Sequence, residues 1–280
     1  MSTLPLWARA LRRLDRLAWY AYHAHEITRD ELFFAWLRPE LRSEATVAAY
    51  SEMRTYLPGG TTFEGGLFGW EQSLFEHQSI PRSGRVLLAA AGGGRELKAL
   101  LDRGFQVTAF EPNPVLFEGA RRVAEGRAGA KVFRASYADL VSAAEGNGPL
   151  ALLTEERFDY VLFGWGSFTH LTEDAVQLSV LGASRALAPQ APLSLSFFMR
   201  SALQPDSRSA RMRQVVRRVL RHAGSARPVE PGLGYDYGGG FVYSFSSDEV
   251  NSLAARAGYR IEFFDEKIFP HVILVPTSAQ

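Results

Sequence analysis

The chain has 280 residues, 31 of them basic and 30 acidic, and it contains no cysteine. That length fits one large domain or a domain with an appendage, and a hydrophobic share of 46% excludes general disorder. The lack of thiols excludes disulfides, a thiolate nucleophile and cysteine-ligated metal centres. A net charge of +1 gives no overall attraction for nucleic acid or an anionic membrane, so we expect neither partner, although local charged patches remain compatible with it.

The sequence has no recognisable secretion signal or membrane span. Residues 1–13 carry a proline and three arginines where a signal peptide needs an apolar stretch. The longest uncharged runs, Tyr160–Thr172 and Ala186–Met199, are shorter than the roughly 18 residues that cross a bilayer. We therefore expect a soluble cytoplasmic protein, and we assign it no metal site.

Residues 1–80 predict a helical N-terminal cap. From Leu6 onward, apolar residues recur every three or four positions with arginines between them, as in an amphipathic helix. Thr28 and Glu31 form a capping box that predicts the start of a second helix through Leu37, and Ser43–Leu57 predicts a third. A glycine-rich stretch with several aromatic residues then leads to a domain boundary near residue 81.

Residues 81–280 predict a doubly wound α/β domain. The predicted strands are 85–90, 106–110, 132–133, 158–163, 193–198, 260–264 and 272–275. Helices are predicted over 95–103, 114–125 and 172–187, and over a segment from the Ser246 capping box to Gly258. The link between the last two strands is too short for a crossover helix, so the last strand should run antiparallel in an otherwise parallel sheet.

A glycine run follows the first strand of this domain. Gly92-Gly93-Gly94 opens the next helix, where glycine lets the backbone approach a ligand and the helix start offers N–H groups to an anion. The second strand ends at Glu111, 17 positions after Gly94, where nucleoside binders hold a ribose diol. Alone, the glycines fit a tight turn and Glu111 fits a solvated strand end. Together they predict an adenosine-type cofactor.

Residues 81–280 resemble the class I S-adenosylmethionine-dependent methyltransferases. The family motif acid-x-Gly-x-Gly-x-Gly falls here on Leu88, Ala90, Gly92 and Gly94. The resemblance implies a Rossmann-like sheet and S-adenosyl-L-methionine as cofactor, with the N-terminal helices as a lid over it. Leu88 departs from the acid that often holds the cofactor's amino group, and Glu96 is the candidate substitute.

The resemblance also implies the rest of the cofactor site. Glu111, followed by Pro112, would accept hydrogen bonds from the ribose hydroxyls. The nearest match to the residues that contact adenine is Ser136-Tyr137, with Asp139 slightly later.

The loop after the fourth strand begins with Gly164 and Trp165. In the family this loop lies beside the sulfonium, where Gly164 would admit the homocysteine part and the ring of Trp165 would cover the cation. A core position for Trp165 is the alternative.

The implied reaction is methyl transfer to an oxygen or nitrogen, less readily carbon, of a small molecule, as in bacterial natural-product biosynthesis. A protonated acceptor needs a proton acceptor in the protein, and His170, His23 and Tyr20 are the candidates. The alternatives are a structural histidine at residue 170 and a helix whose Tyr20 and His23 pack on the core.

Other functions stay open at this point. Relatives of the fold cyclise S-adenosylmethionine or transfer its aminocarboxypropyl group, releasing methylthioadenosine, and a non-catalytic cofactor-binding partner is a third possibility. A nicotinamide dehydrogenase is disfavoured because its Gly-x-Gly-x-x-Gly motif would need glycine at Leu97. The acceptor and the oligomeric state cannot be read from the sequence.

Residues 200–245 predict an insertion on the substrate side. Eight arginines between Arg200 and Arg227 flank an apolar stripe, which fits a solvated helix face or a site for an acidic substrate, carrier protein or nucleic acid. The segment 234–240, with sequence Gly-Tyr-Asp-Tyr-Gly-Gly-Gly, predicts a second, movable wall of the substrate pocket.

Overall fold

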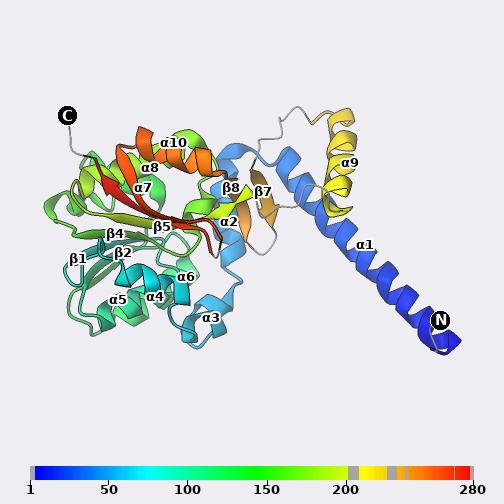
Figure 1. Cartoon of the computed structure of the whole chain (residues 1–280), viewed down its shortest axis with the longest axis horizontal. Coiled ribbons are helices and arrows are strands. Elements are labelled where there is room, and N and C mark those ends of the chain that lie inside the picture. The colour runs from blue at the N-terminus through cyan, green and yellow to red at the C-terminus, as the bar shows by residue number, and fades with distance from the viewer. Residues whose placement is uncertain (1–3, 201–207, 226–231, 237–238, 268, 278–280) are drawn as a thin grey trace.

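A computed structural model describes residues 4–200, 208–225, 232–236, 239–267 and 269–277. Its centre is a seven-stranded sheet with the strand order β3-β2-β1-β4-β5-β10-β9 (Figure 1). The strands are β1 Arg85–Ala89, β2 Gln106–Phe110, β3 Ala130–Phe133, β4 Tyr160–Phe163, β5 Leu193–Ser196, β9 Tyr259–Asp265 and β10 His271–Pro276. β10 pairs antiparallel with both β5 and β9, while the other pairs are parallel. The predicted fold class and the antiparallel last strand are confirmed.

Alternate residues of β1, β4 and β10 enter two separate cores, one on each face of the sheet. In β1, Val86 and Leu88 join one core, whereas Leu87 and Ala89 join the other, as the two-residue period of a strand requires. The first core includes residues of α4 Gly69–Glu76, α5 Arg95–Asp102 and α6 Pro114–Ala124. The second includes residues of α7 Tyr137–Ala144, α8 Asp174–Leu187 and α10 Ser247–Arg256. Leu88 is therefore a core residue, which explains why no carboxylate stands there.

Side-chain caps start several of these helices. The Ser246 capping box is confirmed, because Glu249 N–H donates to Ser246 Oγ while the Glu249 carboxylate accepts from Ser246 N–H. α8 begins at Asp174, two residues later than predicted. The expected strand 193–198 is divided into β5 and a short β6, Phe198–Met199, which pairs with a different sheet.

The first helix, α1, is continuous over Leu6–Trp36, so the predicted break at Thr28 is wrong. The Thr28 hydroxyl donates to the carbonyl of Ala24 at 2.7 Å, which satisfies it inside the helix and leaves it no capping role. α1 ends at Trp36, and Leu37 is already extended. In the part of the chain that the structure describes, no helix combines the length and the apolar character needed to span a bilayer.

Short elements follow α1, and the predicted helix 43–57 is divided among them. They are η1 Pro39–Leu41, α2 Arg42–Tyr50, η2 Arg54–Tyr56 and α3 Thr61–Glu64; η3 Ala151–Glu155 and η4 Ser167–His170 occur later in the chain. The start of α2 and the end of η2 fall within one residue of the predicted limits, whereas residues 51–53 are not helical.

A second, three-stranded sheet with the order β6-β8-β7 packs beside α1 and α2 (Figure 1). It contains β7 Leu233–Asp236 and β8 Gly240–Phe245. Phe34 of α1 shares a small apolar core with residues of β7 and β8, and Phe33 stacks on Tyr235 with ring centroids 4.9 Å apart. Of the 234–240 segment, residues 234–236 end β7 and Gly240 starts β8, while Tyr237 and Gly238 lie outside the described residues.

Part of the arginine-rich stretch forms α9, Arg208–His222, which lies against the second half of α1 (Figure 1). Arg217 pairs with Glu31 at 2.7 Å, and Arg213 lies 3.4–3.5 Å from the carboxylates of Glu31 and Asp30. These arginines therefore balance two buried carboxylates of the same chain. Residues 201–207 and Arg227 lie outside the described residues.

Candidate active site

A cavity of about 530 Å³ lies at the carboxyl ends of β1, β2 and β4. Its sheet side consists of the turns that follow these strands, namely residues 90–93, 111–113 and 165–167. Its other side comes mainly from residues 39–63, with Gly239 and Val242 of the second sheet. In open α/β sheets, ligands bind in the crevice at this edge. Most of the predicted cofactor residues border the cavity, namely Ala90, Gly92, Glu96, Glu111, Pro112, Ser136, Tyr137 and Trp165.

Glycine occupies each of the three positions after β1 for a different structural reason. Gly92 has φ +55°, borders the cavity, and an added Cβ there would meet no atom within 4 Å. At Gly93 a Cβ would lie 1.9 Å from the carbonyl oxygen of Tyr56, so only glycine lets η2 cover this turn. Gly94, with φ +96°, does not border the cavity, and its missing Cβ lets α5 approach Ala120 of α6. Only Gly92 keeps the predicted position toward a ligand.

Glu111 is a buried carboxylate at the cavity wall. One of its oxygens accepts from Gly92 N–H and the other from Asn113 N–H, each at 2.8 Å. Burial raises the pKa of Glu111 to about 7, although the two N–H groups oppose the rise. A carboxylate has about four acceptor positions, so these two bonds leave capacity for hydroxyl donors of a ligand.

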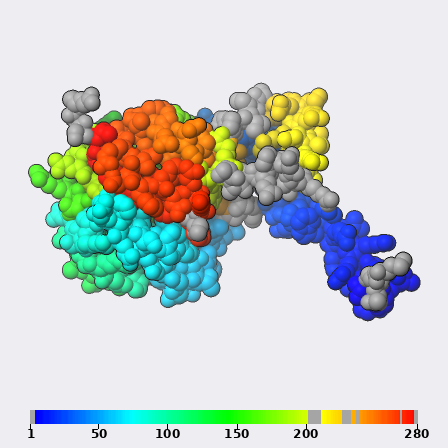
Figure 2. Space-filling model, viewed as in Figure 1, coloured from blue at the N-terminus to red at the C-terminus, as the bar shows by residue number. Residues whose placement is uncertain are grey.

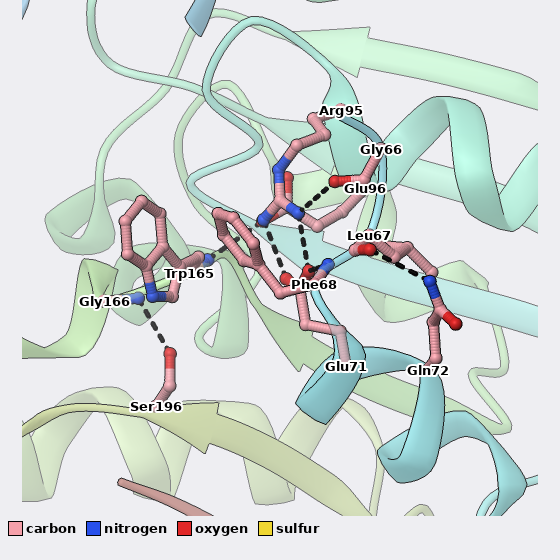
Figure 3. A network of polar contacts seen from close by, with 10 residues as sticks. All are labelled: Gly66, Leu67, Phe68, Glu71, Gln72, Arg95, Glu96, Trp165, Gly166 and Ser196. Atoms are coloured by element: carbon pink, nitrogen blue, oxygen red, sulfur yellow. Dashed lines mark hydrogen bonds and ion pairs between the residues drawn. The ribbon is translucent and has the colours of Figure 1, made fainter. Parts of the chain in front are cut away.

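Arg95 lies between two buried carboxylates beside the cavity (Figure 3). Its guanidinium binds both oxygens of Glu71, at 2.5 and 2.7 Å, and also binds Glu96 at 2.7 Å. Glu96 accepts a further hydrogen bond from Trp165 N–H at 3.1 Å. Burial raises the pKa of Glu71 to about 7 against the effect of Arg95, and the charge of Glu96 adds to the rise. The cluster therefore has one positive charge for two acids.

Ser136 and Tyr137 follow β3 and border the cavity, but Asp139 does not. The Asp139 carboxylate accepts from the backbone N–H and the hydroxyl of Ser136 in a capping box that starts α7. Tyr137 donates its hydroxyl to Ser167 Oγ at 2.7 Å and stacks on Phe163. Asp139 therefore belongs to the helix cap, and the residues of this segment that line the cavity are Ser136, Tyr137 and Ala138.

The loop after β4 places Trp165 at the cavity and Gly164 behind it. A Cβ on Gly164 would lie 2.2 Å from the carbonyl oxygen of Ala90, so glycine is required for this close approach, and Gly164 itself does not border the cavity. Trp165 meets Phe68 edge to face at 4.8 Å between ring centroids. The two predicted residues thus have separate roles, one in packing and one in the wall.

His170 and Tyr50 form a hydrogen-bonded pair in the cavity wall. His170 Nδ1 lies 2.8 Å from the carbonyl oxygen of Phe241, which only accepts, so Nδ1 carries the hydrogen. His170 Nε2 is then the acceptor for the Tyr50 hydroxyl at 2.9 Å. Burial lowers the pKa of His170, so the imidazole is neutral near pH 7. A neutral imidazole with a fixed tautomer can accept a proton.

Tyr20 and His23 are not brought to the cavity. Both lie on the first half of α1, where His23 stacks on Trp19 and its Nδ1 contacts the Trp19 carbonyl at 3.0 Å. Because α1 continues straight through Thr28, this half extends away from the sheet (Figure 1). The part of the N-terminal region that reaches the cavity is residues 39–63.

Sequence reasoning missed several cavity residues, including Thr46, Tyr50, Met53, Tyr56, Phe63 and Asn113. Asn113 had a readable signal, since Asn-Pro starts a helix: its side chain accepts from Val115 and Leu116 N–H, and its Nδ2 donates to the Val47 carbonyl. Tyr50 had none, because its partner His170 is 120 residues away in the chain.

No protein-family model and no curated protein matches the chain. Solved structures are similar in fold. The amino pentose methyltransferase CalS10 from Micromonospora echinaspora, solved with S-adenosylmethionine bound, is 16% identical at a TM-score of 0.52, over 78% of this chain and 94% of that one. A SAM-dependent methyltransferase from Methanosarcina mazei is 14% identical at a TM-score of 0.50, over 75% and 97%. With its strand order and antiparallel last strand, the chain has the Rossmann-like fold of the S-adenosylmethionine-dependent methyltransferases.

Proposed function

We propose that this protein binds S-adenosylmethionine in the cavity and transfers its methyl group to an oxygen or nitrogen of a small-molecule acceptor. The observation that carries the proposal is that the buried carboxylate of Glu111 and the Tyr50–His170 pair border the same cavity. The carboxylate can accept hydrogen bonds from the ribose hydroxyls of a nucleoside cofactor, and the Tyr50–His170 pair can take a proton from the acceptor. The cofactor seen in the amino pentose methyltransferase of similar fold agrees with the first part.

The donors and acceptors around the cavity fit the parts of this cofactor. Glu111, with Pro112 beside it, would accept from the ribose hydroxyls, and the backbone at Gly92 would follow the methionine part. Ser136 and Tyr137 would hold the adenine end. Trp165 borders the cavity after β4, where an aromatic face would favour the sulfonium.

The Arg95 cluster offers a place for the cofactor's ammonium group. Its two carboxylates share one guanidinium, and burial, together with the charge of Glu96, raises the pKa of Glu71. Glu96 borders the cavity, so an ammonium group bound to it would supply a second positive charge for the two carboxylates. This gives Glu96 the role that the buried Leu88 cannot perform.

When bound, S-adenosylmethionine supplies an electrophilic methyl group on a sulfonium, and transfer leaves S-adenosylhomocysteine. The acceptor atom forms the new bond to carbon while the carbon–sulfur bond breaks and its electron pair stays on sulfur. The acceptor's proton would pass to His170 Nε2, directly or through the Tyr50 hydroxyl, whose own proton then moves to Nε2. The cavity walls hold the acceptor in line with the methyl group.

Replacing Glu111 by alanine should weaken S-adenosylmethionine binding about tenfold to a hundredfold, because charge-assisted hydrogen bonds of about 1.5–3 kcal/mol are lost. Titration calorimetry on both proteins measures the effect. Glu118→Ala is the matched control, since that glutamate lies half-exposed on α6 and pairs with Arg121. Equal affinity in Glu111→Ala, or no binding by the parent, would contradict the assignment.

The same carboxylate predicts a pH dependence of binding. With a pKa near 7, Glu111 must release a proton to become the stronger acceptor, so cofactor affinity should fall as the pH drops through 7 toward 6. Between the usual glutamate range and pH 7, folded Glu111 retains a proton that the unfolded chain has lost. The unfolding free energy of the cofactor-free protein should therefore decrease as the pH rises through that window. Glu111→Gln should remove the pH dependence of binding that Glu111 causes and its share of the stability dependence, whereas Glu71, whose pKa is also about 7, should keep its own share.

The nucleoside product distinguishes methyl transfer from the other chemistries of this cofactor. Incubation with methyl-labelled S-adenosylmethionine and a panel of hydroxyl- and amine-bearing small molecules should yield S-adenosylhomocysteine, detected by mass spectrometry, and a labelled acceptor. Methylthioadenosine as the product would instead indicate cyclisation or aminocarboxypropyl transfer. Cofactor binding with no product from any acceptor would indicate a non-catalytic partner.

A further inference from the structure

The first half of α1 has two opposite faces. At about 100° per residue, Leu6, Trp7, Leu11, Leu14 and Leu17 fall on one side of the helix. The other side carries a run of arginines, namely Arg9, Arg12, Arg13 and Arg16. Asp15 is the only acid in the same stretch of about three turns. The segment is therefore a strongly basic amphipathic helix.

The apolar face of this segment is uncovered. Its five large side chains are between 52% and 76% exposed, and residues 9–22 are all exposed. Figure 2 shows the first half of α1 extending away from the body of the molecule. Such a row of exposed leucines with a tryptophan is unusual on a monomer surface and indicates a binding face.

The body of the protein does not use this face. The second half of α1 packs on the body through the buried side chains of Ile27 and Phe34. At about 100° per residue, these two residues lie on the same side of the helix as the arginines of the first half. Closing the helix onto the body along its present contact would cover the arginines and leave the leucines exposed. The apolar face therefore points to a ligand outside the body.

We propose that the first half of α1 binds the surface of an anionic lipid membrane, lying in the plane of the headgroups. Leucine and tryptophan on one face with arginine on the other is the pattern of interfacial helices. Tyr22 lies at one border between the faces, where amphipathic aromatic rings meet the headgroups, and Tyr20 lies between Arg9 and Arg13 on the arginine side. The arginine stems reach past the apolar level to the lipid phosphates.

α9 adds to the positive charge of this end of the molecule. Arg211, Arg218 and Arg221 are exposed on it, and so are Val215 and Val219. Arg213 and Arg217 are the ones that balance the buried acids of α1. Although the net charge of the whole chain is only +1, the region formed by α1 and α9 is basic. Each arginine near an anionic membrane surface strengthens the attraction between the protein and that surface.

A second copy of the helix is a poorer match than lipid. In a symmetric antiparallel pair, the edge of the apolar face that carries Arg13 would meet the same edge of its partner, which brings like charges together. Asp15 is the only acid in either segment to offset them. Anionic headgroups supply the missing negative charge along the whole arginine face.

The test is cosedimentation of the full chain with vesicles of phosphatidylcholine, alone or mixed with phosphatidylserine. We expect binding to the mixed vesicles that weakens with salt, and much weaker binding to phosphatidylcholine alone. Leu14→Gln with Leu17→Gln should weaken binding to mixed vesicles about tenfold or more. Arg12→Gln with Arg16→Gln should weaken it by about tenfold or more as well. Ala8→Gln, outside the apolar face, should leave it unchanged.

Further readouts separate lipid from other partners. A blue shift of tryptophan fluorescence on mixed vesicles, reduced in Trp7→Phe, would place the apolar face in lipid. No binding to mixed vesicles, or binding that survives the leucine changes, would overturn the proposal. So would a dimer in sedimentation velocity that the leucine changes dissociate, since a second copy would then cover the face. Cofactor binding is not involved, so the result is independent of the proposed function.

Discussion

Replacing His170 by asparagine should lower kcat about a hundredfold to ten-thousandfold while the affinity for S-adenosylmethionine stays nearly unchanged. Asparagine can still donate to the Phe241 carbonyl, as Nδ1 does, but it has no basic nitrogen for the acceptor's proton. Tyr50→Phe keeps the ring and removes the hydroxyl, so a fall in kcat there shows that the proton passes through Tyr50. Single-turnover rates with a validated acceptor, together with calorimetry for the cofactor, measure both quantities.

The pH profile tests the same pair. Because burial lowers the pKa of His170, the base remains neutral around pH 7, and the rate should fall only below the usual histidine range. His222→Asn is the matched control, since that histidine lies exposed on α9. If His170→Asn retains the parent kcat and pH profile, His170 is a structural histidine that holds β8 against η4, and an acceptor without a proton to lose becomes the better hypothesis.

Replacing Arg95 by methionine should lower the unfolding free energy by about 3–5 kcal/mol, because Glu71 and Glu96 would remain buried without their cation. Arg95 and both acids are less than a tenth exposed, and the guanidinium also binds the Gly66 carbonyl and stacks over Phe68 at 4.4 Å. The change would thus release α4 and the Gly66 loop from the start of α5. Urea unfolding followed by circular dichroism measures the loss.

Two variants separate charge from packing in this prediction. Adding Glu71→Gln and Glu96→Gln to Arg95→Met should recover part of the lost stability, since no unpaired buried charge is left. Arg121→Met breaks the exposed pair with Glu118 and should change the unfolding free energy little, because solvent screens that pair. A loss in Arg95→Met no larger than in Arg121→Met would show that the buried cluster does not stabilise the fold.

The α/β domain is predictable because its signals are local. A buried strand that ends in glycines, the Glu111 that ends the next strand, and the Ser246 capping box each lie within a few residues of what they determine. The antiparallel direction of the last strand follows from the length of the link before it, since so short a link cannot contain a crossover helix. Seven strands and most of the residues on the sheet side of the cavity could therefore be placed from the sequence.

The cap was predicted less well because its signals compete. Thr28 and Glu31 match a capping box, yet a threonine inside a helix satisfies its hydroxyl on the previous turn, and local sequence does not distinguish the two. The tertiary structure gives Glu31 a partner far along the chain, Arg217, and α1 runs unbroken from Leu6 to Trp36.

What the sequence determined by itself is the fold class, the buried sheet and the carboxylate at the end of β2, because period, length and spacing along the chain define them. Only the tertiary structure decided which residues face each other across the cavity. Tyr50 meets His170, Arg95 meets Glu71, and Gly93 lies under Tyr56, all through contacts between segments far apart in the chain. The physical reason is that a hydrogen bond or ion pair depends on distance in space, which sequence spacing specifies only within one element.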